Sequence, residues 1–100
     1  MHYLICYDIG NDKIRTALAK LLARHQCERV QLSVFLSGLI SKKEYAALSQ
    51  AVSKLLQKKL CQTDSIIIIP MSLPILQTAA IIGDSNCLET IINPPLYLLL

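Results

Sequence analysis

Asp8 is the residue in this sequence whose position most needs a chemical explanation. It comes directly after the apolar run Tyr3–Tyr7 and just before a Gly-Asn-Asp turn at residues 10–12. A carboxylate at the end of a mostly buried strand costs free energy unless it is hydrogen-bonded, paired with a cation or bound to a metal ion. What Asp8 binds therefore decides how the function of the chain is interpreted.

Two uses of Asp8 remain open from the residues alone. In the first, Asp8 holds Mg²⁺, which proteins usually bind through one or two carboxylates together with water and phosphate oxygens. A two-fold axis near Asp8 would supply a second carboxylate, and metal-activated water could then hydrolyse a phosphodiester. In the second, Asp8 accepts hydrogen bonds from the turn at residues 10–12 or pairs with Arg15, without taking part in catalysis.

The ten lysine and arginine residues are concentrated in one part of the chain. The formal net charge is only +3, but all ten lie between Lys13 and Lys59, and none follows Cys61. A positive field of this kind suits a polyanion, although two solvated helix faces would give the same pattern. Phosphate contacts, which position a nucleic acid without reading its sequence, are expected from four side chains: Arg15, Lys20, Arg24 and Arg29. Binding to double-stranded DNA should then weaken steeply with salt.

A buried strand and two helices are predicted to position these groups. The run Tyr3–Tyr7 predicts a short buried strand. Residues 14–22 repeat apolar side chains at helical spacing, which predicts a first helix. Ser41 and Glu44 form a capping box, which predicts the start of a second helix that runs to about Lys59.

Residues 28–37 alternate between apolar and polar side chains, which predicts one half-buried strand ended by Gly38. Phe35 lies on the otherwise polar face of this strand. We expect it either to be buried between two chains or to stack on a base.

The second half of the chain contains two more predicted strands, Ile66–Ile69 and Thr78–Ile82. The whole stretch Ser65–Gly83 lacks charged residues, but Pro70 and Pro74 interrupt it. Two buried strands joined by a loop therefore fit better than a membrane span. The four cysteines form no C-x-x-C motif, and we expect reduced, packed thiols in a cytoplasmic protein.

These elements predict an α+β fold. If residues 28–37 form one strand, the order is βαβαββ; if they bend near Phe35–Gly38, the order is the ferredoxin-like βαββαβ. In either case two helices cover one face of the sheet and leave the other bare. The apolar tail, residues 84–100, also has no obvious place beside a domain formed by residues 1–83. Pairing of two chains with exchange of tails would solve both problems.

Four segments of the sequence carry a family resemblance. They are Tyr-Leu-Ile-Cys-Tyr-Asp-Ile at residues 3–9, Asn-Asp-Lys-Ile-Arg at 11–15, Glu-Arg-Val-Gln-Leu-Ser-Val-Phe at 28–35 and Asp-Ser-Ile-Ile-Ile-Ile-Pro at 64–70. Together they resemble the small CRISPR-associated protein of the spacer-acquisition complex, the Cas-two family. The resemblance covers residues 3–83 in the right order and spacing.

The resemblance implies a ferredoxin-like homodimer whose antiparallel sheet has two helices on one face and whose C-terminal strand packs on the partner. It implies a role beside an integrase during spacer insertion, with a basic surface presented to double-stranded DNA. It also implies magnesium-dependent endonuclease or endoribonuclease activity on DNA or single-stranded RNA, with Asp8 as the catalytic and metal-binding residue. The alternative is a stand-alone metal-dependent ribonuclease of the related toxin type.

Overall fold

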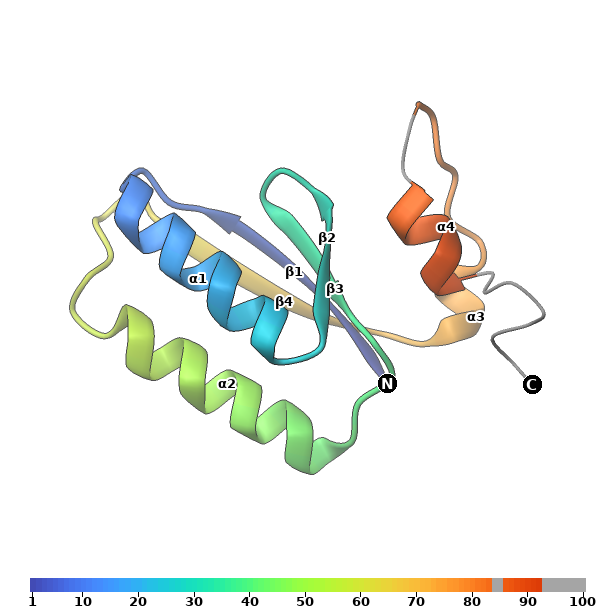
Figure 1. The fold of residues 1–100 in the computed structure, drawn as a ribbon, viewed down its shortest axis with the longest axis horizontal. Helices are drawn as coiled ribbons and strands as arrows, with labels where there is room; N and C mark the ends of the chain where they lie inside the picture. Colours follow the sequence, from blue (N-terminus) through green and yellow to red (C-terminus); the bar gives the residue numbers. More distant parts are fainter. Residues whose placement is uncertain (84–85, 93–100) are drawn as a thin grey trace.

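A four-stranded antiparallel sheet forms the centre of the molecule, seen here in a computed structural model that describes residues 1–83 and 86–92. The strands are β1 (His2–Asp8), β2 (Cys27–Gln31), β3 (Val34–Ser37) and β4 (Ser65–Met71), in the spatial order β2-β3-β1-β4. The helices are α1 (Asp12–Arg24), α2 (Lys42–Leu56), α3 (Leu73–Leu76) and α4 (Asn86–Ile92). Figure 1 shows α1 and α2 side by side on one face of the sheet. The order βαββαβ over the first six elements is the ferredoxin-like arrangement predicted above.

Both long helices begin where local capping signals place them. The Asn11 side chain accepts a hydrogen bond from the Ile14 amide at 3.0 Å, which caps α1. Ser41 and Glu44 form the predicted capping box of α2: the Glu44 amide donates to the Ser41 hydroxyl at 3.1 Å, and the Ser41 amide donates to the Glu44 carboxylate at 3.0 Å. These bonds satisfy amides that have no partner within the helix itself.

The main core lies between α1, α2 and the sheet. Ile5 of β1, Leu18 and Leu22 of α1 and Leu48 of α2 are fully buried there. Burying a side chain of this size contributes about 1.5–3 kcal/mol relative to leaving it in water. This core fixes the end of β1, and with it Asp8, relative to α1.

The predicted single strand over residues 28–37 is wrong, and so is the position of the alternative bend. The chain turns at Leu32–Ser33, so β2 and β3 form an antiparallel hairpin. The sequence alternation continues through the turn because Leu32 is apolar, although its side chain is 84% exposed. The pattern therefore gave no sign of where the strands separate.

The predicted location of Phe35 on an uncovered face is also wrong. Phe35 is paired with Ile5 across the sheet and is only 3% exposed, in the core beneath the helices. Its strand face looks polar in the sequence because β2 is an edge strand, where Arg29, the residue paired with Phe35, remains exposed to solvent. Burial between two chains and direct stacking on a base are both excluded for a ring in this position.

Residues 78–82 do not form the predicted fourth strand. Instead β4 continues through Pro70 to Met71, and Ser72 caps the short helix α3. A proline without an N–H is tolerated because β4 is the other edge strand of the sheet. Among the described helices, none has the length and apolar character needed to cross a bilayer.

The far face of the sheet, opposite α1 and α2, is covered only in part. Leu36 of β3 is buried there against Leu76 and Ile92, which belong to α3 and α4. On β4, Ile67 and Ile69 remain 56% and 41% exposed. The predicted packing of residues 84–100 on a partner concerns a tail of which residues 84–85 and 93–100 lie outside the described part.

Candidate functional site

Asp8 is the last residue of β1, and its side chain is exposed. Its Cα lies opposite that of Ser65 at the start of β4. The carboxylate forms no hydrogen bond or ion pair with any other residue that the structure describes. The structural alternative, in which Asp8 caps the turn or pairs with Arg15, is therefore not what the fold uses. An exposed carboxylate without such partners is available to a cation.

The Arg15 side chain binds the loop that follows Asp8. Its guanidinium donates hydrogen bonds to the carbonyl oxygens of Ile9 at 2.9 Å and Gly10 at 3.2 Å. It also pairs with the Asp12 carboxylate. Arg15 is half-buried in the first turn of α1 and also lines the hollow described next.

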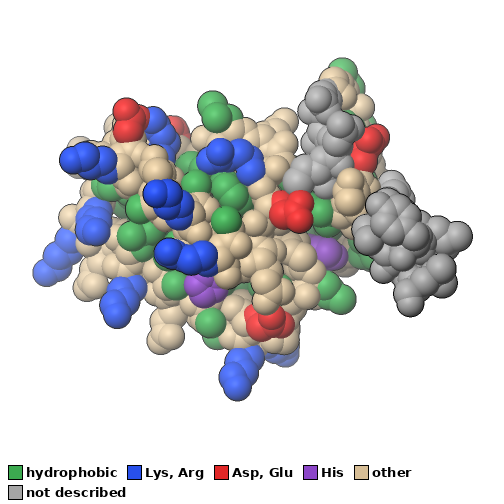
Figure 2. Space-filling model, in the orientation of Figure 1, with side chains coloured by type: hydrophobic (Ala, Val, Ile, Leu, Met, Phe, Trp, Pro, Cys, Tyr) green, Lys and Arg blue, Asp and Glu red, His purple; other side chains and the backbone are tan. Residues whose placement is uncertain are grey.

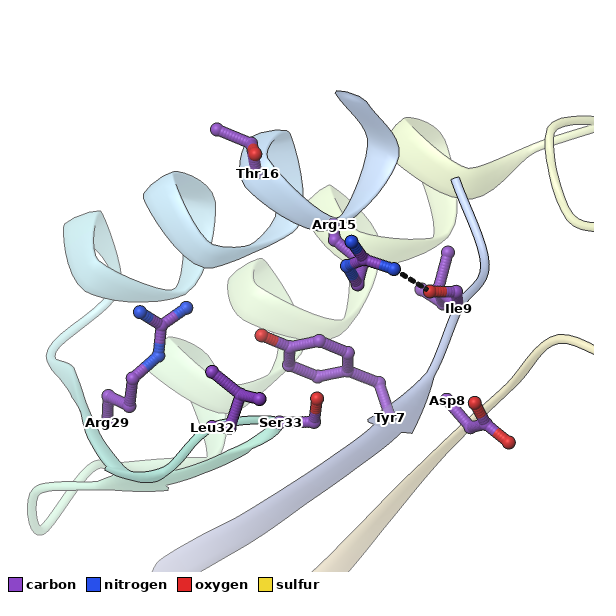
Figure 3. A pocket seen from close by; sticks show the side chains of 8 residues that line it. All are labelled: Tyr7, Asp8, Ile9, Arg15, Thr16, Arg29, Leu32 and Ser33. Atoms are coloured by element: carbon purple, nitrogen blue, oxygen red, sulfur yellow. Dashed lines mark hydrogen bonds between the residues drawn. The ribbon is translucent and has the colours of Figure 1, made fainter. Parts of the chain in front are cut away.

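A hollow of about 410 Å³ lies between the end of β1, α1 and the tip of the β2–β3 hairpin. Tyr7, Arg15, Arg29, Leu32 and Ser33 are among the side chains that line it. Figure 3 shows the buried Tyr7 ring between the two arginines, with its hydroxyl directed toward the side of Arg29, whereas the Asp8 carboxylate points away from the other side chains. The hollow therefore offers guanidinium and hydroxyl donors, which suit a phosphate group.

The Phe35 ring packs against the exposed guanidinium of Arg29, one of the residues that line this hollow. The guanidinium carbon of Arg29 lies 5.2 Å from the centre of the Phe35 ring. Such a cation–π contact contributes about 0.5–1 kcal/mol at an exposed site. The ring thus orients Arg29 without contacting a ligand itself.

The four predicted phosphate-binding residues are not equally placed. Lys20 and Arg29 line one shallow groove between α1 and β2, whereas Arg24 is exposed in the last turn of α1. Arg15 lies at the opposite end of the same helix. Figure 2 shows lysine and arginine side chains gathered over the half of the molecule formed by α1 and α2. Together they form a basic surface rather than one compact binding site.

The donor set for a metal ion within one chain is small. Among the described residues, no three His, Cys, Asp or Glu side chains come together as metal ligands. Asp8 alone therefore fits Mg²⁺ only if water, phosphate oxygens or a second chain complete the coordination shell. Bound there, the ion would supply an activated water and neutralise charge on a phosphodiester.

Sequence reasoning missed Ser33, Leu32 and Asp64 as parts of this region. Asp64 accepts hydrogen bonds from the backbone amides of Cys61 at 2.8 Å and Gly10 at 3.1 Å. These two bonds, that from Cys61 first, lower the pKa of its carboxyl below the usual value. The Asp64–Gly10 contact joins residues 54 positions apart, so no local pattern could have indicated it.

The fold and site define a class: a ferredoxin-like α+β protein with an exposed acid at the end of its first strand and a basic helical surface. The chain belongs to the family described as CRISPR associated protein Cas2, whose model matches residues 1–74. It is 34% identical over 86 residues to the "CRISPR-associated endoribonuclease Cas2 1" of Archaeoglobus fulgidus, covering 86% of this chain and 87% of the relative. A second relative, the "CRISPR-associated endoribonuclease Cas2 2" of Synechocystis, is 58% identical over 33 residues, about a third of each chain.

Solved structures agree with this assignment of the fold. The structure of Streptococcus pyogenes Cas2 at pH 6.5 matches with a TM-score of 0.68 and 23% identity, covering 83% of this chain and all of that one. The hypothetical protein TT1823 of Thermus thermophilus matches with a TM-score of 0.61 and 34% identity, covering 71% of this chain and 80% of that one.

Proposed function

We propose that this protein acts in spacer acquisition as a homodimeric adaptor that binds double-stranded DNA beside an integrase. The observation that carries this proposal is the uneven charge: every lysine and arginine lies between Lys13 and Lys59, and they gather over α1 and α2. Membership of the Cas2 family supplies the CRISPR context. Phosphate contacts from such a surface give binding without sequence preference.

The far face of the sheet supports the dimer. Ile67 and Ile69 are 56% and 41% exposed on an edge strand of the sheet. A second copy would remove these side chains from water. Two-fold symmetry is the commonest arrangement for such pairs, and it would give each Asp8 a counterpart on the other chain.

The adaptor role is tested by binding to a labelled duplex at several salt concentrations. We expect Lys20→Ala and Arg29→Ala each to weaken binding. Each should also reduce the slope of log K against log [salt] by about 1 in magnitude, which corresponds to the loss of one phosphate contact. Lys59→Ala removes the same charge outside the groove and should change binding less. Equal effects of all three variants would contradict preferential use of the groove between α1 and β2, and no retention of duplex by the wild type at low salt would contradict duplex binding altogether.

A second function, magnesium-dependent endoribonuclease activity, is favoured by Asp8, which is exposed and has no partner in the part of the chain that the structure describes. Both curated relatives carry the word endoribonuclease in their names. In this role Asp8 holds the metal ion, while Arg29 and the other donors of the hollow contact neighbouring phosphates of the RNA rather than the cleaved one, because the Asp8 carboxylate points away from them (Figure 3). A chain with only one carboxylate at the site would need its dimer partner or the substrate to complete the shell.

Asp8→Asn separates the two functions because it keeps the shape of the side chain and removes its charge. We expect cleavage of single-stranded RNA in Mg²⁺ to fall at least about a hundredfold, with duplex binding retained. Glu44→Gln, an exposed acid at the start of α2, is the control for loss of one negative charge. Cleavage that survives Asp8→Asn would overturn the catalytic role. Growth arrest on expression, cured by Asp8→Asn, would favour the toxin-type ribonuclease over the adaptor.

A further inference from the structure

The loop between β1 and α1 is held by charged side chains from two sides. On one side, the Arg15 guanidinium binds the carbonyl oxygens of Ile9 and Gly10 at 2.9 and 3.2 Å. On the other, the Asp64 carboxylate accepts the Gly10 amide at 3.1 Å. The peptide group between Ile9 and Gly10 thus donates its N–H to an acid and accepts from a base at its C=O, and the loop begins directly after Asp8.

Asp64 also belongs to the segment that faces Asp8 across the sheet. It directly precedes Ser65, whose Cα is paired with that of Asp8. Its second carboxylate oxygen accepts the Cys61 amide at 2.8 Å, which fixes the loop that enters β4. One side chain therefore restrains the backbone on both strands at the end of the sheet where Asp8 lies.

The Asp64 carboxylate is already committed and is a weak candidate for a metal ligand itself. Each of its oxygens accepts a backbone N–H, and bonds between an ionised group and a backbone amide are stronger than neutral ones. Asp8 has the opposite character: it is exposed and without a partner among the described residues. The two acids at this end of the sheet are thus divided between one that holds backbone and one that is free.

We infer that Asp64 is a positioning residue for Asp8: by holding the Gly10 amide opposite Arg15, it fixes the direction in which the Asp8 carboxylate leaves β1. This role rests on the proposed use of Asp8 as a metal-binding group. Without Asp64, the amides of Gly10 and Cys61 lose these side-chain partners, and Gly10 is held by a side chain only at its carbonyl oxygen, through Arg15, among the described contacts.

The test compares Asp64→Ala, Asp64→Asn and Glu44→Ala in the full chain. Glu44 is the matched control because it is also an exposed acid that accepts a backbone amide, but at the start of α2. The first readout is hydrogen exchange of the Gly10 amide together with the ¹³C carboxyl shift of Asp8, both measured by NMR without substrate. We expect Asp64→Ala to speed Gly10 exchange by about tenfold or more and to move the Asp8 signal. Asp64→Asn keeps one acceptor oxygen and should be intermediate, and Glu44→Ala should change neither signal.

The second readout is the Mg²⁺ concentration that gives half-maximal RNA cleavage. We expect it to rise severalfold in Asp64→Ala while duplex affinity stays within about twofold, because basic side chains carry that affinity. Unchanged Gly10 and Asp8 signals in Asp64→Ala, or equal effects of Glu44→Ala, would overturn the positioning role. If the wild type shows no Mg²⁺-dependent cleavage while Asp64→Ala shows the expected NMR changes, the proposed nuclease activity is overturned but the contact between Asp64 and the Gly10 amide stands.

Discussion

At the scale of single residues, burial divides the cysteines into different chemical types. Cys27 is buried at the start of β2, and desolvation raises the pKa of its thiol to about 11. Cys61 is exposed in the loop between α2 and β4. Because the thiolate is the reactive form, burial should protect the first and leave the second accessible.

We therefore expect Cys61 to react with a disulfide reagent at pH 8 well before Cys27 does. Cys61→Ser should remove one fast-reacting thiol from the native protein, and Cys27→Ser should not. Absorbance of the released chromophore counts the thiols that react in the native protein and, after denaturant is added, all the thiols. A fast phase that is lost in Cys27→Ser would contradict the burial of that thiol.

Residue-scale contacts also explain which parts of the site could be predicted. Asp8 and the basic residues could be named as candidates because an acid ending an apolar run and a block of lysine and arginine are local signals, and their roles stay predictions. The roles of Phe35 and Asp64 could not be predicted, because they depend on Arg29 lying over the ring at 5.2 Å and on Gly10 lying 3.1 Å from the carboxylate. Contacts across an unrecognised hairpin or between distant segments leave no spacing pattern in one sequence.

At the scale of elements, carboxylates that accept backbone amides hold both the start of α2 and the entrance to β4. Hydrogen bonds from the backbone lower the pKa of Glu44, with Ser41 as the largest cause, and that of Asp64, with Cys61 as the largest cause. A pKa that is lower in the folded than in the unfolded state contributes stability above the unfolded pKa. That contribution is lost as the pH falls through the folded pKa.

In the double variant Asp64→Asn, Glu44→Gln, the free energy of unfolding should therefore depend less on pH in the acidic range. We expect the free energy of unfolding of the wild type to decrease more than that of the variant as the pH falls from about 5 to about 3. Urea titrations followed by circular dichroism measure the difference. Parallel curves for the two proteins would show that neither carboxylate is linked to folding.

The elements themselves were predictable where the signal was local and repeated. The helical stripes and the capping box of Ser41 and Glu44 specified α1 and α2 without reference to the rest of the chain. The turn between β2 and β3 could not be located from the sequence, because Leu32 continues the apolar alternation through it. The strand predicted at Thr78–Ile82 failed because β4 runs on through Pro70 and its chain then enters α3.

At the scale of the whole molecule, the dimer proposed here depends on the exposed isoleucines of β4. We expect Ile69→Lys to place a charge in the interface and to lower the mass in solution from twice to once the 11.1 kDa of a single chain. Ile75→Lys is the control, since Ile75 is 57% exposed in α3 rather than on the sheet. Light scattering coupled to size-exclusion chromatography measures both. A lone chain in the wild type, or an unchanged pair in Ile69→Lys, would contradict this interface.

The partial cover on the far face of the sheet has a consequence for how two such molecules could meet. α3 and α4 pack over Leu36, toward β2 and β3, whereas the exposed Ile67 and Ile69 belong to β4 at the opposite edge. A symmetric partner seated on the isoleucines would be displaced sideways from the midline of the sheet. The two sheets would then overlap over only part of their width, and the basic helices of the pair would lie farther apart than in a fully stacked arrangement.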